Sequence, residues 1–304
     1  MAETPRNDLA DKMNLERQLL GSMRGLSRRV ARELRLALAA GQSAPDLALL
    51  SQASIEDRLK QHYRRCERAF GTNLQDQMVD EIKPGKVERE FIQIEILRVL
   101  DNRAENQSRL ISRTMQNLGN SAFQRAANLV ARNDDLTHRD LPTLTANLFL
   151  TATMAQAGAV AVTETQMGTE TCKGIEARML VGQKTTEVKR RADVLTAKKT
   201  WRSQGDSRVR TQANGSKFDH LDADGQTVDG EKPFIVGGEA LLWPGDISLG
   251  ASPGNIIRCR CSAIYDVQSF SRLRRSWLGR LFEDVLKPFR QTESENIVSS
   301  ELGL

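Results

Sequence analysis

The chain has 304 residues, of which 5% are aromatic and 27% are charged, and this composition favours a helix-rich, well-solvated protein over a dense β-sandwich. Its length predicts two or more units. A net charge of +5 permits contact with nucleic acid or an acidic protein surface but requires neither, and four cysteines are too few for a disulfide framework.

The first part of the chain, residues 11 to 133, is predicted to form several antiparallel helices. Its apolar residues recur at spacings of three and four, as one face of a helix requires. One such face is expected to consist of Phe91, Ile94, Leu97 and Leu100. Helix breaks are expected at 41–46, 71–73 and 83–86.

A polar loop at 133–142 is predicted to separate this part from the rest. Residues 141–163 carry no charge, but they include Pro142, Asn147, Gln156 and five threonines. We therefore expect a buried core helix and no contact with a membrane. Two helices are predicted, at 143–167 and 170–204, the second with a strongly basic end.

The sequence after Gly205 predicts a small antiparallel sheet. Gly237-Gly238 separates two short apolar runs, which is typical of a β-hairpin whose turn needs positive φ. From Ile257 to Tyr265 apolar and polar residues alternate, so Cys259 and Cys261 are expected on one buried strand face. The Pro-Gly pairs at 244–245 and 253–254 are interpreted as turns.

The tail at 268–291 is predicted to be an amphipathic helix. The expected fold class is α+β: a mostly helical N-terminal part, a small domain with a short antiparallel sheet, and a C-terminal helix. The predicted domains are 1–135, 136–266 and 267–304.

Cys259 and Cys261 together with His220 suggest part of a zinc site. A fourth ligand would have to be Asp246 or Cys172, and small buried thiols more often pack as core residues. The core interpretation is preferred, so no metal and no cofactor are expected. Residues 220–231 partly match a calcium loop, but His220 in its first place is a poor ligand and an acidic turn is expected instead.

For catalysis, the candidates that could converge with His220 are Glu164, Asp206, Arg208 and Arg210. Arginine, histidine and carboxylate together are what phosphodiester cleavage needs. The preferred interpretation is a salt-bridge lattice that anchors the sheet to the helices. The basic stretch 184–210 could contact DNA phosphates, although the acidic segment that follows offsets its charge.

An ordered set of short motifs between about 155 and 265 resembles the phage Mu F-like head morphogenesis family. The residues that carry this resemblance are Thr163, Glu164, Thr165, Lys199, Trp201, Asp206, Arg208, Arg210, His220, Gly225, Phe234, Pro244, Asp246, Cys259, Arg260 and Cys261. Two positions depart from the family pattern: Arg258 stands where the family has Asn, and the loop 211–219 is longer.

The resemblance implies a non-enzymatic minor head protein of a tailed phage, located in the virion at the portal vertex and in the host cytoplasm during assembly. Its implied partner is the portal protein, with the major capsid or scaffold protein and packaged DNA as further candidates. The family residues are expected to be structural. The alternative is a nucleic-acid-cleaving or toxin-like module that uses Arg208, His220 and nearby carboxylates.

Overall fold

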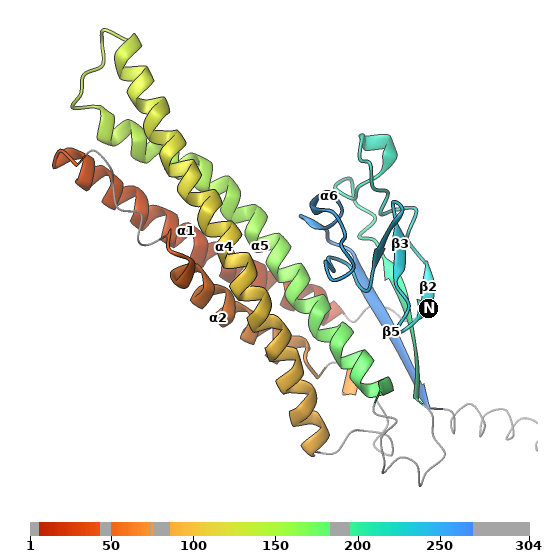
Figure 1. Cartoon of the computed structure of the whole chain (residues 1–304). Helices are drawn as coiled ribbons and strands as arrows, with labels where there is room; N and C mark the ends of the chain where they lie inside the picture. The colour runs from red at the N-terminus through yellow and green to blue at the C-terminus, as the bar shows by residue number, and fades with distance from the viewer. Residues whose placement is uncertain (1–5, 43–49, 73, 76–85, 183–194, 270–304) are drawn as a thin grey trace, which may run out of the picture.

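The computed structural model describes residues 6–42, 50–72, 74–75, 86–182 and 195–269. Long helices form an elongated bundle, and a small group of strands lies beside the C-terminal half of one of them (Figure 1). The helices are α1 (Arg6–Ala39), α2 (Gln52–Phe70), α4 (Lys86–Arg132), α5 (Leu141–Gly182) and the short α6 (Pro253–Ile256). The α+β class and the helical N-terminal part are confirmed.

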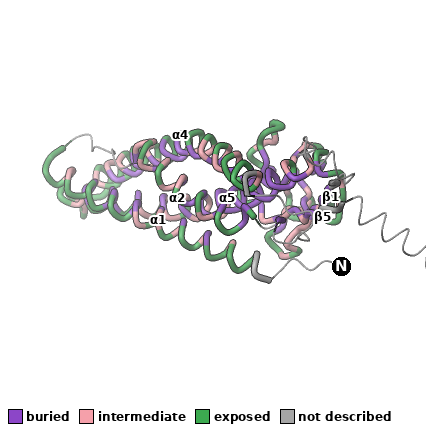
Figure 2. The backbone as a smooth tube through the Cα atoms, turned by 90° about the horizontal axis from the view of Figure 1, so that it is seen from below, coloured by how far each residue is buried: buried purple, intermediate pink, exposed green. Residues whose placement is uncertain are grey.

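The bundle has a continuous apolar core. Helices α1, α2 and α4 each contact α5, and their buried residues, purple in Figure 2, belong to one hydrophobic cluster. Among the most completely buried are Leu19, Met23, Leu26, Leu59, Tyr63 and Phe149. The helix breaks fall near the predicted positions, since α1 ends at Ala39, α2 ends at Phe70 and α4 begins at Lys86.

The predicted apolar face of α4 is wrong in its register. Phe91 and Ile94 are about 60% exposed, whereas Ile92 and Ile96 are fully buried; of the predicted face, Leu100 is fully buried as expected. The sequence from 91 to 97 offers apolar residues at two registers. The buried register is the one that continues along the helix at four- and three-residue spacing, through Ala104, Ile111 and Met115.

Helix α5 joins the two parts of the molecule, because it contacts α1, α2 and α4 and also strands β1 and β5. The uncharged segment 141–163 lies in this helix, which is long and apolar enough to cross a membrane by length and composition, with 39% of its most apolar window buried. The domain boundary at 135/136 stays a prediction.

The predicted helix 170–204 is wrong over its last residues. Helix α5 ends at Gly182, and Leu195–Arg202 form strand β1. Along β1, Ala197, Lys199 and Trp201 are buried while Lys198 is exposed, which is the alternation of a strand with one covered face. The two lysines made this segment resemble the basic end of a helix.

Strand β1 is the centre of a three-stranded antiparallel sheet with the order β2-β1-β5. Strand β2 is Thr227–Asp229 and β5 is Ser262–Ser269. The sheet therefore includes residues before Gly205, outside the range predicted for it. Strand β5 also begins later than the predicted alternation: Ile257 is 44% exposed and Arg258 has φ 57°, so the chain turns before it becomes extended.

The predicted hairpin is confirmed. Strands β3 (Phe234–Val236) and β4 (Glu239–Leu241) pair antiparallel, and Gly237 and Gly238 between them have φ 55° and 81°. Glycine adopts both values without strain because it has no Cβ. Of the predicted tail helix, residues 268–269 belong to β5 and the rest lies outside the described residues.

Candidate functional site

Most of the residues that carry the family resemblance gather where the C-terminal half of α5 meets the strands, whereas Glu164 and Thr165 bond to side chains of α2 and α4. They come from α5, β1, the loop that follows β1, the hairpin and the segment before β5. Arg208 and Gly225 are exposed, and the others are buried or half-buried.

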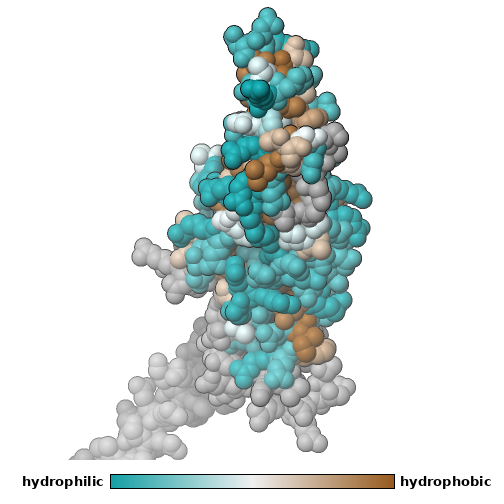
Figure 3. Space-filling view, turned by 90° about the vertical axis from the view of Figure 1, so that its left-hand side faces the viewer, coloured by the Kyte–Doolittle hydropathy of each residue, from teal (hydrophilic) through white to brown (hydrophobic). Residues whose placement is uncertain are grey.

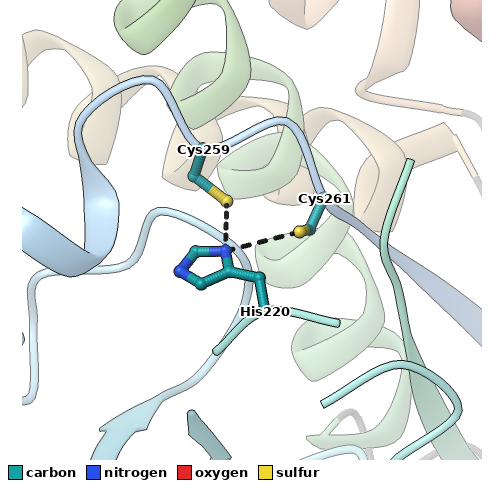
Figure 4. Close-up of side chains that lie close together, drawn as sticks. All are labelled: His220, Cys259 and Cys261. Atoms are coloured by element: carbon teal, nitrogen blue, oxygen red, sulfur yellow. Dashed lines mark hydrogen bonds between the residues drawn. The ribbon is translucent and has the colours of Figure 1, made fainter. Parts of the chain in front are cut away.

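At the centre of this region, the His220 imidazole faces two thiols (Figure 4). Its Nδ1 lies 3.6 Å from Cys259 Sγ and 3.5 Å from Cys261 Sγ. All three side chains are about 2% exposed. The possible metal-ligand atoms of these three side chains all lie within 4.8 Å of one another. Among the residues that the structure describes, this is the group of His, Cys, Asp or Glu side chains that is close enough to hold one metal ion.

Asn255 holds the other side of the imidazole. Its Oδ1 lies 2.8 Å from His220 Nε2, and its Nδ2 donates to Val236 O at 3.0 Å and to Glu239 Oε2 at 3.1 Å. Both of these partners only accept, so the amide orientation is fixed and Oδ1 must receive a hydrogen from Nε2. His220 Nδ1 therefore presents a lone pair to the thiols.

The local sequence explains how the thiols reach this position. Pro253 begins the short helix α6, Cys259 N donates to Ile256 O, and Arg258 in the left-handed region turns the chain toward β5. Arg210 donates to the carbonyl oxygens of Asn255 and Ile257 and so holds this segment against the loop that follows β1.

Aromatic rings pack against the His220 imidazole. The Trp201 ring stands edge-on to the His220 ring, with centroids 5.8 Å apart, and edge-on to the Phe234 ring at 5.4 Å. All three side chains are buried. The cluster thus has an apolar wall, where electrostatic interactions are stronger than in water.

The two thiols differ in their proton affinity. The hydrogen bond from Cys261 holds the pKa of the Cys259 thiol well below its ordinary value. The same hydrogen bond, with burial, raises the pKa of Cys261. The pair therefore favours a thiolate on Cys259.

Asp206 forms a lattice of ion pairs, but not the predicted one. Its carboxylate pairs with Arg260 and, at 3.5 Å, with Arg208, and the hydrogen bond from Arg260 lowers its pKa. Arg210 contacts main-chain oxygens instead. The lattice therefore links the loop after β1 to the segment before β5, and it does not anchor the sheet to the helices.

A cavity of about 570 Å³ opens beside the cluster. Its lining includes His220 and both cysteines, the carboxylates Glu16 and Asp206, and the arginines Arg208, Arg210, Arg258 and Arg260. The structure thus brings four of the five catalytic candidates to one cavity. Glu164 lies elsewhere, since its Oε2 accepts from Tyr63 Oη at 2.5 Å and from Arg103 at 2.9 Å.

Polar side chains of α5 fasten the strands to the bundle. Glu170 Oε2 accepts from Ala263 N at 2.9 Å, Gln166 donates to Cys261 O, and Thr163 Oγ1 accepts from Arg258 N at 3.0 Å. Thr163 was predicted from the resemblance, but Gln166 and Glu170 were missed. Their signal in the sequence is their spacing, since Thr163, Gln166 and Glu170 follow one another at three and four residues and so share one face of the helix.

Lys199 and the turn after the hairpin form a second group of buried polar contacts. Lys199 Nζ donates to Leu242 O at 2.6 Å and lies 5.1 Å from the centroid of the Phe234 ring, and burial lowers its pKa to about 8. Asp246 accepts from Leu242 N and from Ser248 N, both at 2.9 Å, and fixes the turn at Pro244.

The two fourth ligands considered for zinc do not join the cluster, because neither Asp246 nor Cys172 belongs to the converging group. The calcium alternative is not supported either, because the Asp224 carboxylate, one of its expected ligands, is already engaged. Its Oδ1 accepts a hydrogen bond from Ser203 N, and its Oδ2 lies 3.9 Å from Arg202 Nη1. The most important residue missed was Asn255, whose place in a Pro-Gly-Asn turn hides its role behind that of a turn residue.

Chemically, the arrangement offers two sulfurs and one imidazole nitrogen to a soft or borderline cation, beside a cavity lined with arginine. Comparison of the chain with protein-family models, curated proteins and solved structures finds no match.

Proposed function

We propose that the chain is a minor head protein of a tailed phage, which acts without catalysing a reaction in head assembly at the portal vertex. The observation that carries this proposal is the role of the family residues. Thr163, Arg210 and Asp246 bind main-chain atoms, while Trp201 and Phe234 fill the core between the strands.

These contacts are those of residues that hold a small domain together. A motif that determines a fold is what a family of assembly proteins would keep, whereas a catalytic motif would direct its polar groups toward a substrate. One of these residues, Thr163, also fastens the β part to α5 through its bond with Arg258 N.

The bundle offers elongated surfaces for a helical partner. At a rise of 1.5 Å per residue, the 47 residues of α4 extend about 70 Å. Exposed large apolar side chains lie on α1 and α4, namely Leu9, Met13, Leu36, Phe91, Ile94, Leu110 and Leu129. On the face in Figure 3 the brown side chains form separate groups among teal ones, which suits helix-in-groove contacts with a portal or scaffold protein better than one large flat interface.

The test is co-sedimentation with rings of the portal protein encoded in the same genome. The full chain is expected to sediment with the rings, and Phe91→Glu with Ile94→Glu is expected to weaken the association by at least about tenfold, which is the loss of about 1.4 kcal/mol. Leu221→Glu, at an exposed apolar position of the β part, is the matched control. If the full chain does not sediment with the rings, the proposal is wrong.

The nuclease alternative draws its support from the arginines and carboxylates around the cavity. The state of His220 speaks against it, because Nε2 is engaged by Asn255 and Nδ1 faces the thiols, so the imidazole is not free to take a proton from a water in the cavity. Incubation with plasmid and RNA, with and without chelator, tests it. Cleavage that disappears in Arg208→Ala, a substitution of an exposed side chain, would favour the nuclease.

A further inference from the structure

We propose that Cys259, Cys261 and His220 Nδ1 bind one zinc ion, whose fourth position faces the arginine-lined cavity. The inference does not depend on the proposed function, and it departs from the expectation of no metal drawn from the sequence.

The spacing of the three ligand atoms fits a tetrahedral zinc site. Zinc lies about 2.3 Å from a thiolate sulfur and about 2.0–2.1 Å from an imidazole nitrogen, so two such ligands at a tetrahedral angle are about 3.6 Å apart. The observed Sγ to Nδ1 separations are 3.6 Å for Cys259 and 3.5 Å for Cys261. An ion would therefore fit among the side chains as they stand (Figure 4).

Hydrogen bonding alone joins only one of the two thiols directly to the imidazole. Both thiols approach the same nitrogen, Nδ1, which has a single lone pair, so only one S–H can donate to it in a metal-free protein. The other ring nitrogen cannot take the second thiol because it is bonded to Asn255. A metal ion engages both sulfurs and the nitrogen at once.

Asn255 supplies the contact that metal-bound histidines usually have. Such a histidine donates its second N–H to a neighbouring acceptor, which fixes its tautomer and ring orientation. The Asn255 amide does this, and it is itself fixed by Val236 O and Glu239. The imidazole is thus held in the form that binds a metal.

The ligand set selects the metal and the fourth ligand. Two thiolates and an imidazole favour zinc over the hard cations calcium and magnesium, which take oxygen ligands. No fourth protein side chain joins the group within the described ranges, while the cavity reaches all three ligands. Solvent water is therefore the fourth ligand, as in other zinc sites with three protein ligands.

The experiment measures metal in the full chain. Protein produced in zinc-supplemented medium and purified under reducing conditions is expected to contain one zinc per chain. After removal of zinc, cobalt is the probe: the spectrum is expected to show sulfur-to-cobalt charge transfer and the d–d bands of tetrahedral coordination. Cys259→Ser and Cys261→Ser should each lower zinc affinity at least about 100-fold, and Cys172→Ser, a buried thiol outside the cluster, should leave it unchanged.

The wild-type measurements decide the matter even if a serine variant fails to fold. A reduced wild-type chain that contains no zinc and gives no thiolate charge-transfer band with cobalt overturns the proposal. Zinc content that persists in folded Cys259→Ser and Cys261→Ser also overturns it, because the ion would then lie elsewhere. Neither result bears on the association with portal rings.

Discussion

The contact between Gly174 of α5 and Trp243 gives the sharpest test of how the strands are attached to the bundle. A Cβ built on Gly174 would lie 2.3 Å from Trp243 Cε3 and 2.8 Å from two further ring atoms. Carbon atoms pack best at 3.5–4.0 Å, so the ring or the helix would have to move by more than about 1 Å. Gly174→Ala should therefore disturb the attachment.

The magnitude follows from two opposing effects. Overpacking a well-filled core costs about 3 kcal/mol at the upper end, and replacing glycine by alanine inside a helix contributes about 1 kcal/mol of stability. Gly174→Ala should thus lower the free energy of unfolding by about 2 kcal/mol. Gly158→Ala in the same helix, where the added Cβ meets no atom within 4 Å, should raise it by about 1 kcal/mol.

The assay is urea denaturation followed by far-UV circular dichroism, which does not depend on the tryptophan that is changed. In a Trp243→Leu background, Gly174→Ala should lose most of its cost, because the ring that it strikes is gone. Equal stabilities of Gly174→Ala and Gly158→Ala, or an unchanged cost in the Trp243→Leu background, would refute the packing argument.

Two further predictions concern single residues. Arg258→Gly should raise the free energy of unfolding by about 0.5–1 kcal/mol, because φ 57° strains any residue with a Cβ; a lower urea midpoint would contradict this. His62 is buried, and burial, with the charge of Arg65, lowers its pKa from 6.5 to about 4. As pH drops, the unfolded chain binds a proton on His62 before the folded chain does. The free energy of unfolding should therefore fall by up to about 3 kcal/mol between pH 6.5 and pH 4. In His62→Gln, the urea midpoint should fall less steeply over this pH range than it does in the wild-type chain.

The parts of the fold that local chemistry determines could be predicted from the sequence. The hairpin followed from Gly237-Gly238, because no other pair of residues adopts two positive φ values so readily. The helix breaks followed from glycine and proline. The buried face of α4 could not be predicted in the same way, because two sets of apolar residues both satisfy the helical spacing. Only the packing against α2 and α5 selects the set that contains Ile92 and Ile96.

Strand β1 could not be predicted because a distant contact reverses the local preference. Lys199 is typical of an exposed or helical position, yet its ammonium is buried against Leu242 O, 43 residues away. For the site, the prediction that Cys259 and Cys261 are both buried is confirmed, but the prediction that they lie on a strand is wrong, because β5 begins only at Ser262. The sequence could not place the imidazole of His220 between them, because Asn255 and Arg210 position that side chain through contacts across the β part.

The structural and metal-binding interpretations of the cluster are compatible, because they concern different bonds. Trp201, Arg210 and Asp206 hold the segments that carry His220 and the thiols whether or not an ion is present. Most of the hydrophobic core is made of side chains of α1, α2, α4 and α5, although the same core continues into the β part and includes both thiols. Because most of that core lies among the helices, removing zinc should loosen the segments that carry the three ligands without unfolding the helices. The proposed portal-binding surface on the bundle and the proposed metal site in the β part can therefore be tested separately.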